Sequence, residues 1–322
     1  RDKPGRARRV FKAIIANFFT IWNPFLRPGG DFFPKIPRGT RYGLQSGGKG
    51  GKLLLLRKKG GENMVSIVEV TTKAQLRRFV EYPIELYKDV PQYIPGTYDD
   101  DLQDWDRKKN PAFEYCQARC WLAMRDGEIV GRIGAILSRK ANEKWHTNRL
   151  RFTQVDFIDD YQVSKALFDT VEDWARQLGC TQVHGPLGFT DMDREGMLVE
   201  GFDRRSCFFT YYNHPYYKDH LAALGYEKDV DWIEELITAP TDEKVIQRWE
   251  KLSNYVLKRQ KLHIHKVRTR LDYPPLIRKV FQLVNIAYSP LYGTVELSEA
   301  QIKRYAGTVS YTHLTLPTIL RV

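Results

Sequence analysis

The chain has 322 residues, of which 42% are hydrophobic, 13% aromatic and 28% charged. This length fits one large domain or two ordinary ones, and the composition excludes disorder throughout. The sequence has no run of about 18 uncharged apolar residues, which argues against a membrane-spanning helix. The four cysteines are too few for a disulfide scaffold, and Cys116 and Cys120 lack the second pair that a zinc site needs. We therefore expect reduced thiols, no metal and a cytoplasmic protein.

The net charge of +12 comes from the beginning of the chain. Residues 1–63 hold 15 Lys and Arg against 3 Asp and Glu, whereas residues 64–322 are balanced, with 36 of each kind. Such a basic leader fits an amphipathic anchor for anionic lipid, or upstream sequence translated ahead of a start at Met64. We favour the second interpretation, in which residues 1–63 are disordered or not native. The balanced remainder argues against nucleic acid as a partner.

From Met64 on, the pattern alternates between strands and helices. Apolar residues at every second position predict strands, and apolar spacings of three and four predict helices. Asp126-Gly127 lies between two apolar runs and predicts a tight hairpin turn. In chain order we expect a strand over 64–70, a helix capped by Thr71 or Thr72, breaks at Pro83, Pro91 and Pro95, a loop or short helix over 98–105, and a hairpin over 121–137.

The second half continues the alternation. We expect a strand over 149–157, a helix capped by Asp159 or Asp160 and ended by Gly179, a strand over 181–184, and a glycine-punctuated loop over 185–203. A helix from Pro215 to Gly225, a strand over 226–237, helices over 245–263 and 276–287, an extended piece over 268–272, and a helix begun by Ser298 complete the series. This order predicts an α/β fold with a mixed, mostly antiparallel sheet flanked by helices.

One long motif resembles a known family. It reads Gly185-Pro186-Leu187-Gly188-Phe189-Thr190-Asp191-Met192-Asp193-Arg194-Glu195-Gly196, with Leu198 to Phe202, Tyr212 to Tyr217, Leu224-Gly225-Tyr226 and Asn285 to Gly293 adding to it. This pattern is similar to the YghO-like group, including the bacterial ceramide synthase type, of the GNAT acyl-CoA N-acyltransferases. The resemblance implies a GNAT-like domain over 64–240, and a helical linker with the start of a truncated second such domain over 241–307.

The resemblance implies acyl transfer from acyl-coenzyme A to an amine, such as a sphingoid base or another lipid amine. That reaction needs a group to take a proton from the amine and a helix N-terminus to receive the pyrophosphate. Here the corresponding junction reads Phe157-Ile158-Asp159-Asp160-Tyr161-Gln162-Val163, with no glycine and two carboxylates. The family's acid tyrosine falls on Leu221. We therefore expect this domain to lack coenzyme binding, so that the chain supplies an acceptor-side or scaffolding half that is inactive alone.

The candidate site residues lie in and beside the motif. As catalytic groups we name His184, Asp191, Asp193 and Glu195, and as substrate-binding groups Arg194, Tyr211, Tyr212, Asn213, His214 and Tyr217. A loop that satisfies its own backbone, a hydrogen-bonded core histidine, and packing of the tyrosines are the competing structural interpretations. The six Lys and Arg residues of 258–270 are typical of a solvated face or of contact with anionic lipid or phosphate.

Three further expectations concern the end of the chain, contact with the membrane and an alternative function. Val309 to Thr318 resembles a translated sequencing adapter, so we expect residues 308–322 to be an artefact. A lipid-linked substrate would bring the protein to the inner face of the membrane as a peripheral contact. A non-enzymatic GNAT-like module that binds a small molecule or a protein is the alternative. An apolar tunnel at Gly185–Asp193 would favour the enzyme, and a closed loop there would favour the module.

Overall fold

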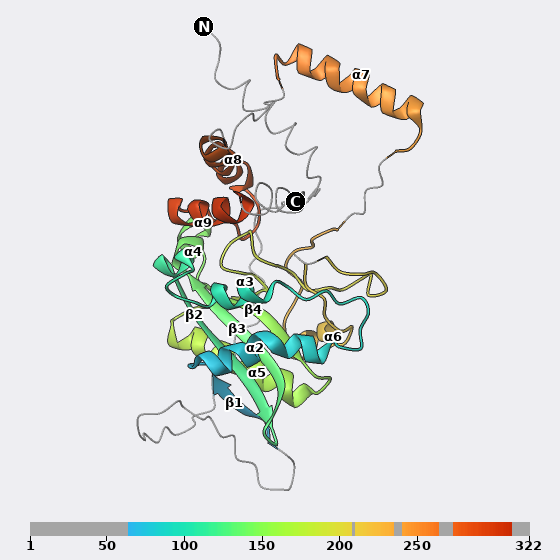
Figure 1. Ribbon diagram of the computed structural model, residues 1–322. Helices are drawn as coiled ribbons and strands as arrows, with labels where there is room; N and C mark the ends of the chain where they lie inside the picture. The colour runs from blue at the N-terminus through green and yellow to red at the C-terminus, as the bar shows by residue number, and fades with distance from the viewer. Residues whose placement is uncertain (1–63, 208–209, 235–239, 264–272, 311–322) are drawn as a thin grey trace, which may run out of the picture. The chain divides into compact units, whose positions relative to one another are not determined.

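The computed structural model describes residues 64–207, 210–234, 240–263 and 273–310. It divides into two compact units, one formed by the described residues up to Val230 together with Tyr288–Glu296, and the other by the described residues of Asp231–Ala287 and from Leu297 on. The first unit contains, in order, β1 (Ser66–Glu69), α2 (Lys73–Leu86), α3 (Tyr98–Asp104), a 3₁₀ turn (Pro111–Glu114), β2 (Cys116–Arg125), β3 (Glu128–Ser138), α4 (Arg139–Trp145), β4 (Arg149–Phe157), α5 (Tyr161–Gln177), β5 (Gln182–His184) and α6 (Tyr217–Ala223) (Figure 1).

The sheet of the first unit has five strands in the order β1-β2-β3-β4-β5. The first four are antiparallel neighbours, and β5 alone runs parallel to β4. Asp126 and Gly127 join β2 to β3 with φ angles of 52° and 87°, the left-handed geometry of a two-residue hairpin turn. The predicted α/β fold with a mixed, mostly antiparallel sheet is confirmed.

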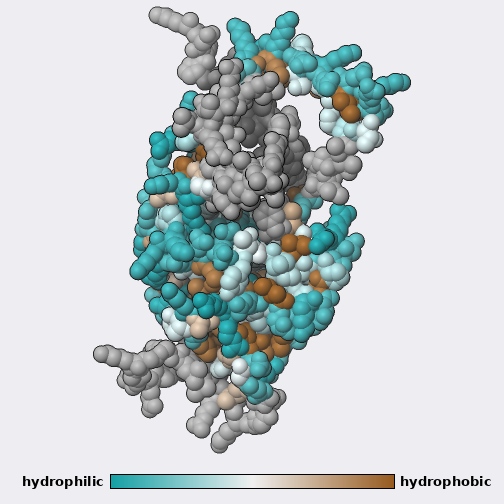
Figure 2. Space-filling view, in the orientation of Figure 1, coloured by the Kyte–Doolittle hydropathy of each residue, from teal (hydrophilic) through white to brown (hydrophobic). Residues whose placement is uncertain are grey.

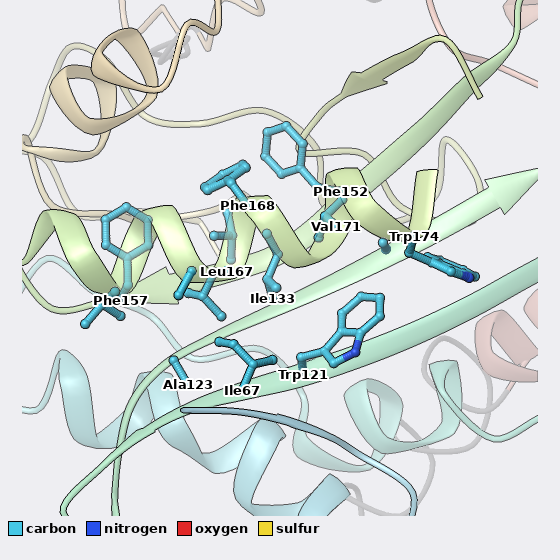
Figure 3. Close-up of a cluster of buried hydrophobic side chains, with 14 of the residues drawn as sticks. Ile67, Trp121, Ala123, Ile133, Phe152, Phe157, Leu167, Phe168, Val171 and Trp174 are labelled. Carbon is cyan, nitrogen blue, oxygen red and sulfur yellow. The ribbon is translucent and has the colours of Figure 1, made fainter. Parts of the chain in front are cut away.

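Helices cover both faces of this sheet. The side chains of β2 alternate, so that Trp121 packs in one cluster while Cys120 and Leu122 pack in another. The Trp121 cluster is the larger and is closed by the apolar face of α5, as Figure 3 shows for Leu167, Phe168, Val171 and Trp174. On the opposite face, Phe79 and Val80 of α2 cover Cys120 and Leu122. The strands and the amphipathic helix over 161–177 therefore match the sequence pattern.

Helix α2 corrects one expectation, because Pro83 lies inside it instead of ending it. Thr72 begins the helix with a capping box, as expected. A proline has no N–H to donate to the carbonyl four residues earlier, which here is Phe79 O. The guanidinium of Arg132 donates to that oxygen at 2.7 Å instead. A donor from β3 thus replaces the missing helical hydrogen bond, and the helix continues to Leu86.

The predicted strand over 226–237 is a second correction, since the described part, 226–234, forms no strand. Side-chain contacts take the place of ladder hydrogen bonds there. The Tyr226 ring packs on Phe152 and Phe168, and its hydroxyl donates to Glu172 at 3.2 Å. Asp229 binds Arg149 at 3.5 Å and accepts a hydrogen bond from Tyr292. Residues 235–237 lie outside the described residues.

All the secondary structure described in the second unit is helical. It contains α7 (Glu243–Arg259), α8 (Tyr273–Tyr288, whose last residue belongs to the first unit) and α9 (Glu299–Ser310). Phe281, Leu297 and Ile302 form its apolar cluster. Ser298 caps α9 as expected, since its hydroxyl accepts the Gln301 N–H at 3.3 Å. The Ser298 N–H in turn donates to Gln301 Oε1 at 2.8 Å. None of the described helices of the chain is long and apolar enough to cross a membrane.

Some expectations fall on residues that the structure does not describe. These are the basic leader over 1–63, the extended piece over 268–272, and most of the segment that resembles an adapter. All three stay predictions.

Candidate active site

The motif forms a long loop between β5 and α6, which we call the acidic loop and define as residues 185–203. It leaves β5 along the edge of β4, where the Leu187 N–H donates to Phe152 O at 2.9 Å. It then closes on itself, because the Gly196 N–H donates to Pro186 O at 2.9 Å. These two bonds hold the charged residues of the loop against the last strands of the sheet.

Arg151 of β4 holds the acidic loop through hydrogen bonds to backbone carbonyls. Its side chain is almost fully buried and donates to Gly188 O at 2.9 Å and to Gly293 O at 2.6 Å. The loop is thereby joined to the segment Tyr288–Glu296 of the same unit. Buried guanidinium groups bound to two carbonyls leave little freedom to either backbone, so Arg151 sets the position of both segments.

Asp193 and Asp191 are held by specific partners. Asp193 accepts a hydrogen bond of 3.0 Å from the Thr190 N–H. It lies so close to Gly188 that a Cβ there would be 2.3 Å from the Cβ of Asp193, which is why this position carries glycine. Asp191 accepts a hydrogen bond of 2.9 Å from the Thr294 hydroxyl, and burial raises its pKa. For Asp193, the interpretation as a loop that satisfies its own backbone accounts for the geometry.

Glu195 differs from both aspartates in its electrostatics. Burial, followed by repulsion from Asp191 and Asp193, raises the pKa of its carboxyl to about 8, although Arg151 opposes this. A carboxyl with this pKa exchanges its proton near neutral pH, as a general acid or base must. Among the four predicted catalytic residues, Glu195 has the electrostatic environment that best suits proton transfer.

Arg194 ties the acidic loop to α3. It forms an ion pair with Asp101, and its guanidinium lies 5.1 Å from the centre of the Tyr211 ring. Gly96 makes room for it, because a Cβ there would be 2.7 Å from an Arg194 nitrogen. Two predicted substrate-binding residues, Arg194 and Tyr211, are thus brought together, but their partners are protein groups.

His184 is held as a hydrogen-bonded imidazole. Its Nδ1 lies 3.1 Å from the Tyr292 hydroxyl, and that hydroxyl donates to Asp229. Burial and the nearby charges of Arg151 and Arg149 lower its pKa to about 3. Such an imidazole is neutral at pH 7 and a weak base. This geometry favours the structural interpretation over the role of proton acceptor.

Of the remaining predicted residues, Tyr212, His214 and Tyr217 lie around Tyr87 at the end of α2. Tyr212 and His214 pack on the Tyr87 ring, and the Tyr217 and Tyr87 hydroxyls are 2.9 Å apart. Asn213 instead binds both backbone groups of Leu198, at 2.7 Å and 3.0 Å. Packing and backbone satisfaction therefore explain these four side chains.

Beneath that group lies a buried polar chain that the sequence did not indicate. The Tyr87 hydroxyl donates to Asp156 at 2.8 Å, and Arg132 donates to the other Asp156 oxygen at 2.7 Å. The far end of the chain is Tyr217, whose hydroxyl accepts the Phe157 N–H at 2.8 Å. This chain fixes the end of β4 and the start of α6 relative to α2.

A small pocket opens between these two groups of residues. It is lined by Val155 of β4, Pro186, Gly196 and Met197 of the acidic loop, and residues 211–213 with Tyr217. It has room for about one water molecule. The pocket is therefore not the apolar tunnel that a bound acyl chain would need.

Carboxylates occupy the N-terminus of α5, as the sequence predicts. Asp160 caps the helix, accepting the Gln162 N–H at 2.8 Å, and pairs with Arg125 at 2.7 Å. Asp159 lies beside it and accepts a hydrogen bond of 3.0 Å from His220. An anion at this position would meet two carboxylates, one of which already caps the first turn of the helix. The residues present do not fit a coenzyme pyrophosphate here.

Two residues that organise the site were missed by sequence reasoning. Arg151 lies in an alternating strand pattern that gives no sign of its carbonyl partners, and Asp101 is one of four neighbouring acidic residues in 99–104. The described residues contain no cluster of His, Cys, Asp and Glu able to hold a metal ion. Cys116, Cys120, Cys180 and Cys207 are free thiols.

The sequence of the chain is similar to two curated proteins. No protein-family model matches the chain. It is 28% identical over 243 residues to protein YghO of Escherichia coli (strain K12), a match to 74% of this chain and 60% of that protein. It is also 28% identical over 251 residues to the bacterial ceramide synthase of Caulobacter vibrioides, covering 75% and 62%. The chain thus matches about three fifths of the length of these curated relatives.

Two solved structures are similar to about half of the chain. A putative acetyl transferase from Pyrococcus furiosus is 12% identical with a TM-score of 0.34, covering 54% of this chain and 99% of the other. A ribosomal-protein-alanine N-acetyltransferase from Brucella melitensis biovar Abortus 2308 is 13% identical with a TM-score of 0.31, covering 55% and 99%. Both curated relatives bear names of the group that the long motif of the acidic loop resembles.

Proposed function

We propose that this chain is the acceptor-side part of an N-acyltransferase that joins an acyl group from acyl-coenzyme A to an amine. Its similarity to a bacterial ceramide synthase supports a lipid amine, such as a sphingoid base, as the acceptor. The assignment of 64–240 to a GNAT-like domain, and of 241–307 to a linker and the start of a second one, belongs to this proposal.

The observation that carries the proposal is the position of Glu195 beside Asp191. Asp191, Asp193 and Glu195 lie within five residues of one loop and repel one another when ionised, and a primary ammonium group relieves that repulsion when it binds. The ammonium must then lose a proton before its nitrogen can attack a thioester. Glu195, with a pKa of about 8, is suited to accept that proton.

The N-terminus of α5 does not suit the acyl donor, acyl-coenzyme A. Asp160 accepts the Gln162 N–H in the first turn of that helix, and Asp159 places a second carboxylate beside it. The proposal therefore assigns no coenzyme site to α5 and no step of the reaction to this position. We expect no acyl transfer by this chain alone.

One observation favours the alternative function, a non-enzymatic binding module. The acidic loop closes through Gly196 and Pro186, and the pocket behind it holds about one water molecule. A module of this kind would bind an ammonium group at the loop surface without transferring anything to it. Both functions predict amine binding, and they differ in whether an acylated product forms when a donor-binding part is present.

Amine binding is tested by titrating the whole chain with octylamine in a calorimeter at about pH 7, in two buffers of different ionisation enthalpy. Glu195 is then largely protonated, and a bound ammonium lowers its pKa, so that binding releases up to about one proton. The Glu195→Gln variant is expected to lose that release. The Glu200→Gln variant, at an exposed position of the same loop, is expected to keep it.

Two results would contradict the proposal. Equal proton release by the wild-type chain and the Glu195→Gln variant would show that Glu195 takes no part in binding the amine. Stoichiometric binding of coenzyme A to the chain would overturn its assignment to the acceptor side.

A further inference from the structure

Helix α7 carries an apolar stripe that nothing within the described chain covers. It has 17 residues, and none of them is buried. Val245, Trp249, Leu252 and Val256 follow one another at spacings of four, three and four, so they lie along one face. The exposed fractions of Trp249 and Leu252 are 57% and 60%. Figure 2 shows apolar and hydrophilic side chains side by side on this helix.

A second stripe on the same helix is basic. Lys244, Arg248 and Lys251 each precede one member of the apolar stripe, so the basic stripe is rotated from it by about 100°. Lys258 and Arg259 extend it through the last turn. The helix contains five basic residues and two acidic ones, Glu243 and Glu250.

Helix α5 provides an internal comparison, because it has the same length of 17 residues. Its apolar face is buried in the core, and its charged residues pair with one another, as Lys165 does with Asp169 at 2.7 Å and Arg176 with Glu172 at 2.9 Å. Helix α5, which covers a protein core, thus has nearly balanced charges, with two basic and three acidic residues. Helix α7 has neither the burial nor the balance.

We infer that α7 lies on an anionic lipid surface, with the Trp249 stripe in the boundary between headgroups and acyl chains and the basic stripe against the phosphates. Trp and Leu on one face and Lys and Arg on the other are the composition of helices that lie in this boundary. Tyr255 lies on the basic side of the helix, and its hydroxyl accepts a hydrogen bond of 3.1 Å from Arg259. The charge of the basic stripe selects acidic headgroups over a neutral bilayer.

Vesicle binding by the whole chain tests this inference. The probes are phosphatidylcholine vesicles with and without phosphatidylglycerol, measured by co-sedimentation. Because the basic leader also attracts anionic lipid, the decisive comparison is between two variants of equal net charge. Lys244→Glu with Lys251→Glu reverses two charges of α7, and Lys108→Glu with Lys109→Glu reverses two exposed charges elsewhere.

The α7 pair is expected to weaken partition into the anionic vesicles by about tenfold or more, and the control pair by much less. Leu252→Gln is expected to weaken it about tenfold through the apolar stripe. Trp249→Phe keeps the stripe apolar, so it should retain binding but lose the vesicle-induced blue shift of tryptophan emission. Circular dichroism verifies that each variant stays helical.

The inference fails if the two charge-reversed pairs lose binding equally, because general charge or the leader would then explain the attraction. It also fails if Leu252→Gln leaves partition unchanged while lowering the mass of the chain in light scattering. In that case the stripe would join two protein copies.

Discussion

Asp160 accepts a hydrogen bond of 2.8 Å from the backbone N–H of Gln162, in the first turn of α5. The same carboxylate pairs with Arg125 from the end of β2 at 2.7 Å. One side chain thus satisfies a free helix donor and neutralises a cation of the neighbouring strand. The arrangement stabilises the join between sheet and helix, and it fills the position where an anionic ligand would otherwise bind.

Replacing Asp160 should separate these roles. Asp160→Ala is expected to lower the free energy of unfolding by about 1 kcal/mol, since it removes the cap, and Asp160→Asn by less, because Asn still caps. Burial raises the pKa of Asp160, but hydrogen bonds from Arg125 and the Gln162 N–H outweigh it and hold that pKa below its usual value. The difference between wild type and Asp160→Ala should therefore persist above about pH 4 and disappear at lower pH. Urea unfolding at several pH values measures it, and a constant difference would contradict this account.

The buried pair of Arg132 and Asp156 should matter far more than pairs at the surface. Both side chains are less than a tenth exposed, and Arg132 also donates to Phe79 O. Asp156→Asn leaves the guanidinium charge buried without its partner, so we expect a loss of about 3 kcal/mol in the free energy of unfolding.

The matched control for Asp156→Asn is Glu69→Gln, which removes the partner of Arg119 in a half-exposed pair of 3.6 Å. That change is expected to cost less than about 0.5 kcal/mol. Similar losses for both variants, measured by chemical denaturation, would show that the polar chain beneath Tyr87 does not stabilise the fold.

The sequence alone predicts those structural elements that depend on local patterns. Alternation gives β4, the three- and four-residue spacing gives α5, and Asp126-Gly127 gives the hairpin, because each depends on neighbours in the chain. The acidic loop was also located, since its glycines and carboxylates are contiguous. These features position the candidate site without knowledge of any distant contact.

Other features depend on partners far along the chain and were not predictable. Pro83 stays helical only because Arg132 replaces its missing donor. The role of Arg151 depends on Gly293, 142 residues away. The described residues after Tyr226 do not form a strand, and Asp229 among them binds Arg149 of β4 and Tyr292 of the segment Tyr288–Glu296 instead of a sheet edge.

Gly188→Ala tests whether Asp193 and Gly188 determine the shape of the acidic loop. The new methyl group would lie 2.3 Å from the Asp193 Cβ, so one backbone must move. We expect a loss of about 1–3 kcal/mol in the free energy of unfolding, as for other overpacked sites. The control is Gly307→Ala in α9, where a Cβ meets nothing within 4 Å. That change should be neutral or stabilising by up to about 1 kcal/mol. A neutral Gly188→Ala would mean that the loop is free to move.

The pKa of Glu195 makes a prediction about stability that does not depend on any ligand. The folded chain keeps a proton on this carboxyl up to about pH 8, whereas the unfolded chain loses it near the ordinary value of about 4.3. Between these values the folded state binds more protons, so wild-type stability should fall as pH rises, with a slope of up to about 1.4 kcal/mol per pH unit from this group.

Glu195→Gln removes the ionisable proton and should therefore be close to wild type near pH 4 and more stable than wild type at about pH 8. Glu200→Gln, at an exposed position, should follow the wild-type curve throughout. Urea unfolding of the three proteins across this range measures the effect, and parallel curves for wild type and Glu195→Gln would show that Glu195 is an ordinary solvated carboxylate, unsuited to take a proton from an amine.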